Sequence, residues 1–425
     1  MPFRITVLRA DEILDSRARP TLSVTAGLAG GAVGHAGVPS GTSLGRHEAV
    51  ELRDHDPARF LGQGVSLAVS HVNGEIADAL HGRDFTDQAS FDRALTDLDG
   101  TPDLSRLGAN ALIGVSMAVA RAAAARWGRP LWEYLVPEGV TPVLPVPHFT
   151  VVDGGLHAAN PLDVQGFMIA PFGARNMTEA VRAGAEIHGR LGRRLAGAEG
   201  SRGVARLGDE GGFAPGLSEP EEILRLLVRT IREAGYQPGR EGVAIALDVA
   251  ADAIRGPDGR YLVNGEKLTS EDLIARYRQI TADFPVHSIE DPLAEDDRTG
   301  WAQLTRELGG RVRLVGDDLF ATNPALIGRA VDEGIANAAV IKPNQVGTVT
   351  EALRALAVCR HAGYDAMVAH RSGETEDTFI ADLAVGSGCG LFKAGAPARG
   401  ERVAKYNRLT RIASRHSELD YGPGR

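Results

Sequence analysis

The chain has 425 residues, 43% of them hydrophobic, and carries a formal net charge of −9. This length predicts two or three domains rather than one, and the negative charge argues against a nucleic-acid-binding surface. No apolar run reaches 18 residues, the N-terminus lacks the apolar core of a signal peptide, and two cysteines are too few for a disulfide framework. We therefore expect a reduced, cytoplasmic protein without a membrane partner.

The first third of the chain is predicted to form an α+β domain, which we place at residues 1–137. Alternating polar and apolar residues predict strands at 3–8, 21–26 and 32–38. Helical periodicity follows at 67–80 and 109–127, and the many alanines of the second helix indicate close packing. Between strand and helix lies Pro39-Ser-Gly-Thr-Ser-Leu-Gly, whose hydroxyl groups could reach a site from a mobile loop.

A proline-rich segment at 136–147 excludes a helix and marks a domain boundary, so the second domain is placed at residues 138–425. Short apolar runs alternate there with helical segments, which favours a parallel sheet closed into a β/α barrel. The expected helices are 179–195, 221–234 and 348–361. The expected strands are 167–170, 244–249, 286–289, 314–315, 338–341, 366–369 and 390–393.

Charged or polar residues stand where the predicted barrel strands end, each about one β/α unit after the previous one. They are Asp248, Glu290, Asp317, Lys342, His370-Arg371-Ser372 and Lys393. Residues at the carboxyl ends of parallel strands point into one mouth of a barrel, where its active site lies. Any one of them could equally be a structural salt bridge, but the whole set in register predicts a shared site.

The types of residue at these strand ends predict a chemistry. Asp248, Glu290 and Asp317 would repel one another unless a cation lay among them, and Mg2+ prefers such hard oxygen ligands. Lysines and an arginine across the mouth suit an anionic substrate, and a lysine opposite a metal site can act as a base.

A further candidate is the acidic turn Gly208-Asp-Glu-Gly-Gly-Phe-Ala-Pro. Its charged pair is bracketed by glycines, which is unlike core packing. We interpret it as a loop that presents Glu210, or alternatively Asp209, to the site as a general acid. A tight acidic turn without a catalytic role is the other interpretation.

From Asp15 to about Ile412 the chain resembles the enolase family of phosphopyruvate hydratases. The resemblance rests on the two loops above and on further motifs: Leu107-Gly-Ala-Asn, Ser288-Ile-Glu-Asp-Pro, Gly316-Asp-Asp-Leu-Phe, Ile341-Lys-Pro-Asn-Gln, His370-Arg-Ser-Gly-Glu-Thr-Glu-Asp and Arg402-Val-Ala-Lys-Tyr-Asn. It implies an enolase-like fold, Mg2+ as cofactor, 2-phosphoglycerate as a small phosphorylated carboxylate substrate, and a homodimer or a multiple of dimers.

The resemblance also implies roles for individual residues. Asp248, Glu290 and Asp317 would hold one Mg2+, and Ser43 would reach a second. Lys342 would remove the C2 proton, and Glu210 would protonate the departing C3 hydroxyl. Arg371 and Ser372 would hold the phosphate, and the pocket would be completed by His157, Gln165, His370 and Lys393.

The sequence departs from the family pattern at several positions. Gly166 stands where the family usually has an active-site glutamate, and Asp153 where an asparagine usually begins the motif before His157. The segment Arg17-Ala-Arg-Pro and Asp252 also differ. The glycine removes both a negative charge and side-chain volume next to the reacting carbon.

Three functions follow from these observations. The first is an enolase acting on 2-phosphoglycerate, as in glycolysis. The second is a related lyase with room at Gly166 for a bulkier group, such as a carboxyphosphonoenolpyruvate synthase of phosphonate antibiotic biosynthesis. The third is a non-catalytic scaffold on the same fold, which the retained Lys342, Glu210 and carboxylates argue against.

Overall fold

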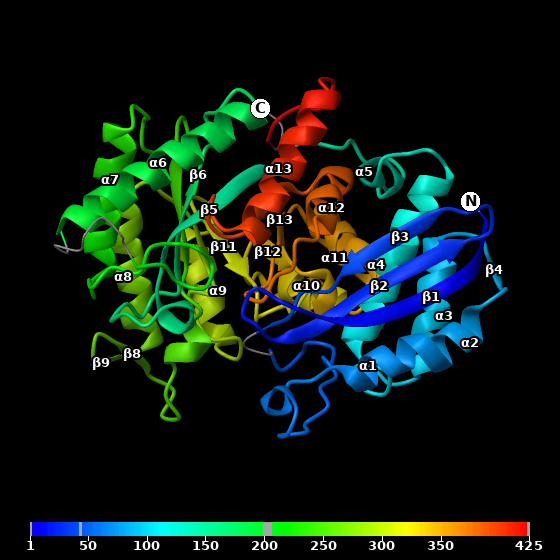
Figure 1. The fold of residues 1–425 in the computed structure, drawn as a ribbon. Coiled ribbons are helices and arrows are strands. Elements are labelled where there is room, and N and C mark those ends of the chain that lie inside the picture. The colour runs from blue at the N-terminus through cyan, green and yellow to red at the C-terminus, as the bar shows by residue number, and fades with distance from the viewer. Residues whose placement is uncertain (1, 42–44, 199–205, 423–425) are drawn as a thin grey trace.

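The computed structural model describes residues 2–41, 45–198 and 206–422, and the chain forms an α+β unit followed by a closed barrel (Figure 1). This confirms the predicted fold class. The boundary predicted between residues 137 and 138 falls in the segment between helix α5 (Leu131–Tyr134) and strand β5 (Val146–Asp153). Ser43, a predicted metal ligand, lies outside the described residues.

The N-terminal unit is a four-stranded antiparallel sheet covered by helices on one face. Its strands, in the order β3-β2-β1-β4, are β1 (Phe3–Leu14), β2 (Pro20–Leu28), β3 (Val33–Gly37) and β4 (Asp84–Phe85). Its helices are α1 (Ser66–His71), α2 (Ala77–Leu80), α3 (Gln88–Asp99), α4 (Ala109–Arg126) and α5.

Helix α4 lies against the sheet because its small side chains allow a close approach. A Cβ atom added to Gly34 of β3 would lie 2.1 Å from the carbonyl oxygen of Ala118, so the strand and the helix touch through their backbones. The alanine-rich periodicity of the sequence predicted this packing. It did not predict α3, which begins at a capping box formed by Asp87 and Ser90 and ends at the left-handed Gly100.

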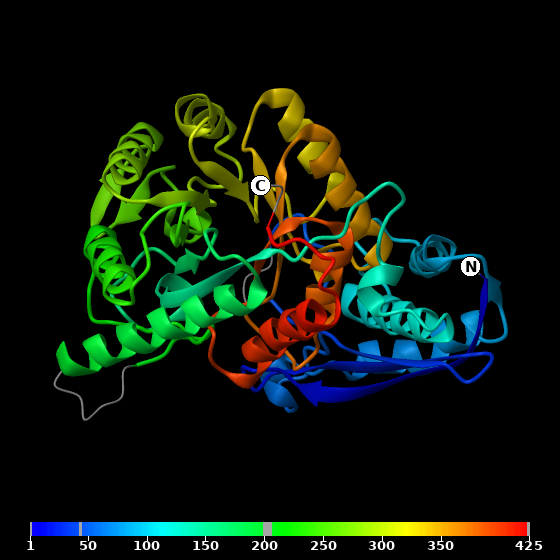
Figure 2. The same cartoon turned by 90° about the horizontal axis from the view of Figure 1, so that it is seen from above.

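The barrel is closed by eight strands with helices around its outside (Figures 1 and 2). The strands are β5, β6 (Gly166–Ala170), β7 (Ala244–Asp248), β10 (Val286–Glu290), β11 (Arg313–Gly316), β12 (Ala338–Ile341), β13 (Asp365–Ala369) and β14 (Gly390–Lys393). A small hairpin, β8 (Tyr261–Val263) and β9 (Glu266–Leu268), lies outside the barrel sheet. The helices are α6 (Met177–Ala198), α7 (Pro220–Glu233), α8 (Ser270–Asp283), α9 (Arg298–Leu308), α10 (Pro324–Glu333), α11 (Val349–Ala362), α12 (Phe379–Ser387) and α13 (Gly400–Arg415).

The sheet differs from the prediction in one strand, because β6 runs antiparallel to both neighbours. A parallel connection needs a crossover, usually a helix, whereas residues 154–165 link β5 to β6 with only one short 3₁₀ turn. Strand β5 itself was not predicted, because its start, including Pro147, lies in the proline-rich segment assigned to the domain boundary. Because β6 is reversed, its first residue, Gly166, pairs with the last residues of both neighbours, Asp153 and Asp248.

The two units are joined by a buried polar network around Asp92 of α3. Its carboxylate accepts hydrogen bonds from the backbone nitrogen (2.9 Å) and hydroxyl (2.6 Å) of Thr350 in α11, and from Ser116 of α4 at 2.7 Å. These bonds connect helices on both sides of the junction. In the part of the chain that the structure describes, no helix is long and apolar enough to cross a bilayer.

We predict that Asp92→Ala lowers the free energy of unfolding by about 2–3 kcal/mol, because it leaves buried donors of Ser116 and Thr350 without an acceptor. Urea denaturation measures the change. The matched control is Asp97→Ala, since Asp97 is exposed on the same helix and its loss is expected to cost less than about 0.5 kcal/mol. Equal stability of the two variants would contradict the role given to this network.

Candidate active site

The predicted strand-end residues meet at one end of the barrel. Asp248, Glu290 and Lys393 are the last residues of β7, β10 and β14, while Asp317, Lys342 and His370 directly follow β11, β12 and β13. All of them except Glu290 line a cavity of about 350 Å³. Of the candidates in the described residues, the cavity is lined by His157, Gln165, Glu210, Asp248, Asp317, Lys342, His370, Arg371, Ser372 and Lys393.

One predicted ligand, Glu290, does not line this cavity but lies directly behind Lys393. The ammonium of Lys393 is 2.5 and 2.7 Å from the two carboxylate oxygens of Glu290 and 3.4 Å from Oδ2 of Asp248. Burial raises the pKa of Glu290 well above its ordinary value, and the charge of Asp248 adds to this effect. The lysine therefore offsets repulsion between two carboxyl groups that would otherwise resist ionisation together.

Lys342 forms a second ion pair, with Oδ2 of Asp317. Burial opposes the charge on Lys342, but the nearby carboxylates, chiefly Asp317 and also Glu290, raise the pKa of the lysine above its ordinary value. The sequence predicted a lysine that can act as a base. In the contact with Asp317 the lysine is held in its protonated form, so a base at this position must first leave that ion pair.

The donor set of Asp248, Glu290 and Asp317 fits a divalent cation. All three are carboxylates, they converge on two lysines, and their negative charge is offset by those ammonium groups and, farther away, by Arg371. Hard oxygen donors of this kind suit Mg2+. These residues would hold the ion.

A different acidic group, Asp291, Asp317 and Asp318, brings carboxylate oxygens within 4.8 Å of one another. The two oxygens of Asp291 are already engaged, since they accept hydrogen bonds from the backbone nitrogens of Asp317 and Asp318, each at 2.9 Å. Asp291 therefore acts as an anchor that fixes the turn after β11. Only Asp317 belongs to both groups.

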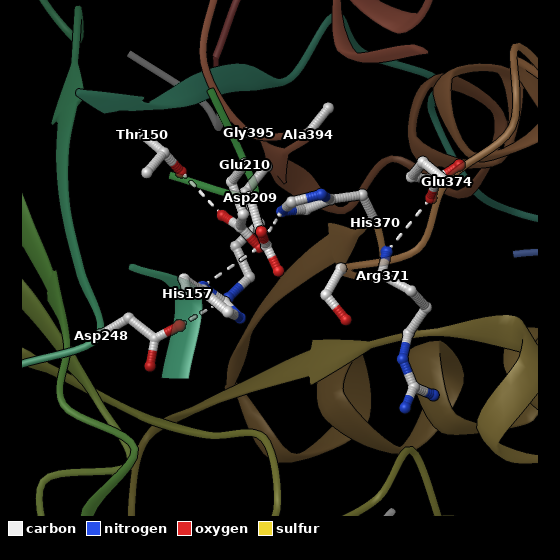
Figure 3. Close-up of polar contacts among 12 residues, drawn as sticks. Thr150, His157, Asp209, Glu210, Asp248, His370, Arg371, Glu374, Ala394 and Gly395 are labelled. Carbon is white, nitrogen blue, oxygen red and sulfur yellow. Dashed lines mark hydrogen bonds and ion pairs between the residues drawn. The ribbon is translucent and has the colours of Figure 1, made fainter. Parts of the chain in front are cut away.

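The acidic turn delivers Glu210 rather than Asp209 into the cavity. The Glu210 carboxylate accepts a hydrogen bond from the hydroxyl of Thr150 at 3.1 Å and lies 3.3 Å from Nε2 of His370 and 3.7 Å from Nδ1 of His157 (Figure 3). Burial lowers the pKa of His370 to about 3, so this ring is neutral and donates a hydrogen bond. Asp209 instead forms an ion pair with Arg17 at 3.2 Å.

The predicted phosphate-binding group is held by residues that the sequence analysis did not select. Arg371 donates to the carboxylate of Glu48 at 2.8 and 3.2 Å, and both side chains are buried. Glu48 lies three residues after Gly45, the last residue of the hydroxyl-rich loop, and that position was its only signal in the sequence.

Arg402, which is fully buried in α13, donates to the carbonyl oxygens of Arg371 at 2.7 Å and Ser372 at 2.6 Å and also contacts His370. It belongs to a quoted motif, but that motif did not reveal this supporting position. The backbone that presents the phosphate-binding residues is therefore fixed from behind by one buried guanidinium.

Comparisons with known proteins agree with this arrangement. Residues 5–135 match the family model "Enolase, N-terminal domain", and residues 141–421 match "Enolase, C-terminal TIM barrel domain". A protein named enolase from Rubrobacter xylanophilus is 50% identical over 423 residues, covering 99% of this chain and 97% of that protein. Another, from Acidothermus cellulolyticus, is 51% identical over 417 residues, covering 98% and 95%.

The barrel and its strand-end carboxylates and lysines define a β/α-barrel lyase. The family matches and the full-length identity to curated relatives show that the chain belongs to the enolase family. It is thus a carbon–oxygen lyase of the phosphopyruvate hydratase type.

Proposed function

We propose that the protein dehydrates 2-phosphoglycerate to phosphoenolpyruvate with Mg2+. The observation that supports this most is that two separately held groups line one cavity. Lys342 lines it together with Asp317, its ion-pair partner, and Asp248, and Glu210 lines it from the loop after α6, in contact with His157 and His370. An elimination needs a base at one carbon and an acid at the leaving group on the next.

In this proposal Lys342 takes the C2 proton, and Glu210 gives a proton to the departing C3 hydroxyl, which leaves as water. Lys342 must first exchange its ion pair with Asp317 for a neutral state. Asp248, Glu290 and Asp317 would hold Mg2+, which would supply positive charge where the substrate carboxylate gains negative charge.

Arg371 and Ser372 bind the substrate phosphate in this proposal, with His157, Gln165, His370 and Lys393 completing the pocket. The bidentate contact of Arg371 with Glu48 shows that its guanidinium already presents two parallel donors. A phosphate accepts the same fork of hydrogen bonds as a carboxylate. Substrate binding then requires Glu48 and the phosphate to share the arginine, or one to replace the other.

A second candidate is supported by the open space at Gly166. A Cβ atom added there would have a single neighbour within 4 Å, Cβ of Asp248 at 3.4 Å. This space could receive a substrate group larger than a hydroxyl, as in a carboxyphosphonoenolpyruvate synthase. The same lysine, carboxylates and arginine would serve that reaction.

The proposed base is tested by hydrogen exchange. We expect wild-type protein with Mg2+ to exchange the C2 hydrogen of 2-phosphoglycerate with deuterated water, and Lys342→Ala to lose this exchange by at least about 100-fold. NMR of the substrate follows it. Exchange that persists in Lys342→Ala would assign the base to another residue. The control is Lys267→Ala, which changes an exposed lysine outside the barrel mouth.

The metal site is tested by calorimetric titration with Mg2+. Asp317→Asn keeps the size of the side chain but removes its charge, so we expect Mg2+ affinity to fall by at least about tenfold. Asp332→Asn, on the outer helix α10, is the matched control. Unchanged affinity in Asp317→Asn would rule out the proposed ligand set.

Gly166→Glu separates the two candidate functions. If 2-phosphoglycerate is the substrate, the added carboxylate is expected to raise the affinity of Glu210 for a proton. We then expect turnover to rise about five- to thirty-fold, which corresponds to about 1–2 kcal/mol of the activation barrier. If a larger substrate occupies this space, the variant blocks the native reaction. Robust wild-type turnover of 2-phosphoglycerate that the substitution lowers or leaves unchanged would contradict the interpretation of this position.

A further inference from the structure

A second carboxyl group, Asp153, lies buried beneath the loop that carries Glu210. It is the last residue of β5 and has no exposed surface. Its Oδ2 accepts hydrogen bonds from the backbone nitrogens of Glu210 at 3.2 Å and Gly212 at 3.1 Å. The loop is thus folded around this carboxyl.

Two glycines of the acidic turn make that contact possible. A Cβ atom at Gly208 would lie 2.3 Å from Oδ2 of Asp153, and one at Gly212 would lie 2.7 Å from Oδ1. Any side chain at either position would push the loop away from the carboxyl. The glycines that flank Glu210 in the sequence therefore serve its attachment to Asp153.

The other oxygen of Asp153, Oδ1, is buried without a hydrogen-bond partner among the described residues. A bare carboxylate oxygen in such a place is costly, and protonation removes the charge. Burial raises the pKa of Asp153 well above its ordinary value, and the nearby charge of Glu210 adds to this effect, while Arg402 opposes it.

Glu210 differs from Asp153 in its surroundings. Burial opposes its ionisation too, but its contacts with His370 and His157, including the hydrogen bond from His370, and the charge of Arg402 hold its pKa well below the ordinary value. Lys393 adds positive charge from β14. When their surroundings shift the pKa values of two nearby carboxyl groups in opposite directions, the two groups titrate as a pair. Such a pair holds one proton over a wide pH range.

We propose that Asp153 is a positioning residue for the elimination step, anchoring the loop under Glu210 and sharing one proton with it. This rests on the proposed function. The proton moves from Asp153 to Glu210 and then to the departing hydroxyl, which leaves as water, and a solvent proton later restores Asp153. Asp153 also pairs with Gly166 in the β5–β6 ladder, so two of the positions that depart from the family pattern are direct neighbours.

Asp153→Asn tests the proposal, because the amide oxygen can still accept from Glu210 and Gly212 but the side chain cannot hold an exchangeable proton. We expect phosphoenolpyruvate formation at neutral pH to fall by about tenfold or more. Exchange of the C2 hydrogen, which depends on Lys342, is expected to stay within about twofold of wild type.

The pH profile gives a second readout. In wild type the pair keeps its proton up to the raised pKa of Asp153. In Asp153→Asn only Glu210 remains, and its pKa is lowered, so its acid form disappears at lower pH. The basic limb of the elimination profile is therefore expected to move to lower pH in the variant.

The matched control is Asp99→Asn. Asp99 is another buried carboxylate that accepts backbone hydrogen bonds, from Leu107 at 2.7 Å and Thr101 at 3.0 Å, but it lies in the N-terminal unit. It is expected to leave both steps unchanged. If Asp153→Asn slows exchange and elimination equally, or changes neither, or leaves the basic limb in place, the proposal is overturned.

A measurement on folded wild-type protein covers the case in which Asp153→Asn does not fold. Infrared spectra of protein with labelled aspartate carboxyls are expected to show a protonated aspartic acid at neutral pH that titrates at lower pH in Glu210→Gln. No such difference between the two proteins would overturn the shared proton. A wild type without activity on 2-phosphoglycerate would instead overturn the proposed function, and the infrared result would still decide the proton sharing.

Discussion

The structure of the site depends on how negative charge is offset at the mouth of the barrel. Asp248, Glu290 and Asp317 are brought to one end of the barrel because each ends or follows a parallel strand, and hydrophobic packing cannot stabilise carboxylates of which Glu290 and Asp317 are buried and Asp248 is half-buried. Lys393 and Lys342 offset their charge in two ion pairs. The carboxylates make the site suited to a divalent cation, and the lysines make it suited to an anionic substrate.

This arrangement couples the base to the metal ligands. While Asp317 pairs with Lys342, the lysine keeps its proton, and any added positive charge near Asp317 weakens that hold. The acid side is built separately, from a glycine-flanked loop that Thr150, His370 and Asp153 fix in place. The proposed base and the proposed acid are therefore held by different residues, and Lys393 is the charged group that acts on both sides.

The sequence predicted the strand ends well, because an apolar run that closes in charge leaves few other structures for a buried parallel strand. It could not predict the reversal of β6, which follows from a short connection rather than from periodicity. It also did not reveal how Glu48 holds Arg371 or how Asp153 lies under Glu210. Both contacts join segments far apart in the chain: the first joins the N-terminal unit to the barrel, and the second joins strand β5 to the loop after α6.

The position of Gly166 shows how much the reversal matters. On a parallel strand the first residue would lie at the opposite end of the barrel, whereas here it lies between Asp153 and Asp248 at the active-site edge. Two of the departures read from the sequence, Gly166 and Asp153, thus lie beside the proposed metal ligand Asp248 and beneath the loop of the proposed acid, Glu210.

The central claim is that this carboxylate-and-lysine mouth dehydrates 2-phosphoglycerate with the help of a divalent cation. Steady-state turnover of the wild-type protein, followed by the absorbance of phosphoenolpyruvate, tests it most directly. The account predicts product formation with Mg2+ and its loss when the cation is removed by a chelator. No product with Mg2+, or undiminished turnover after chelation, would contradict it.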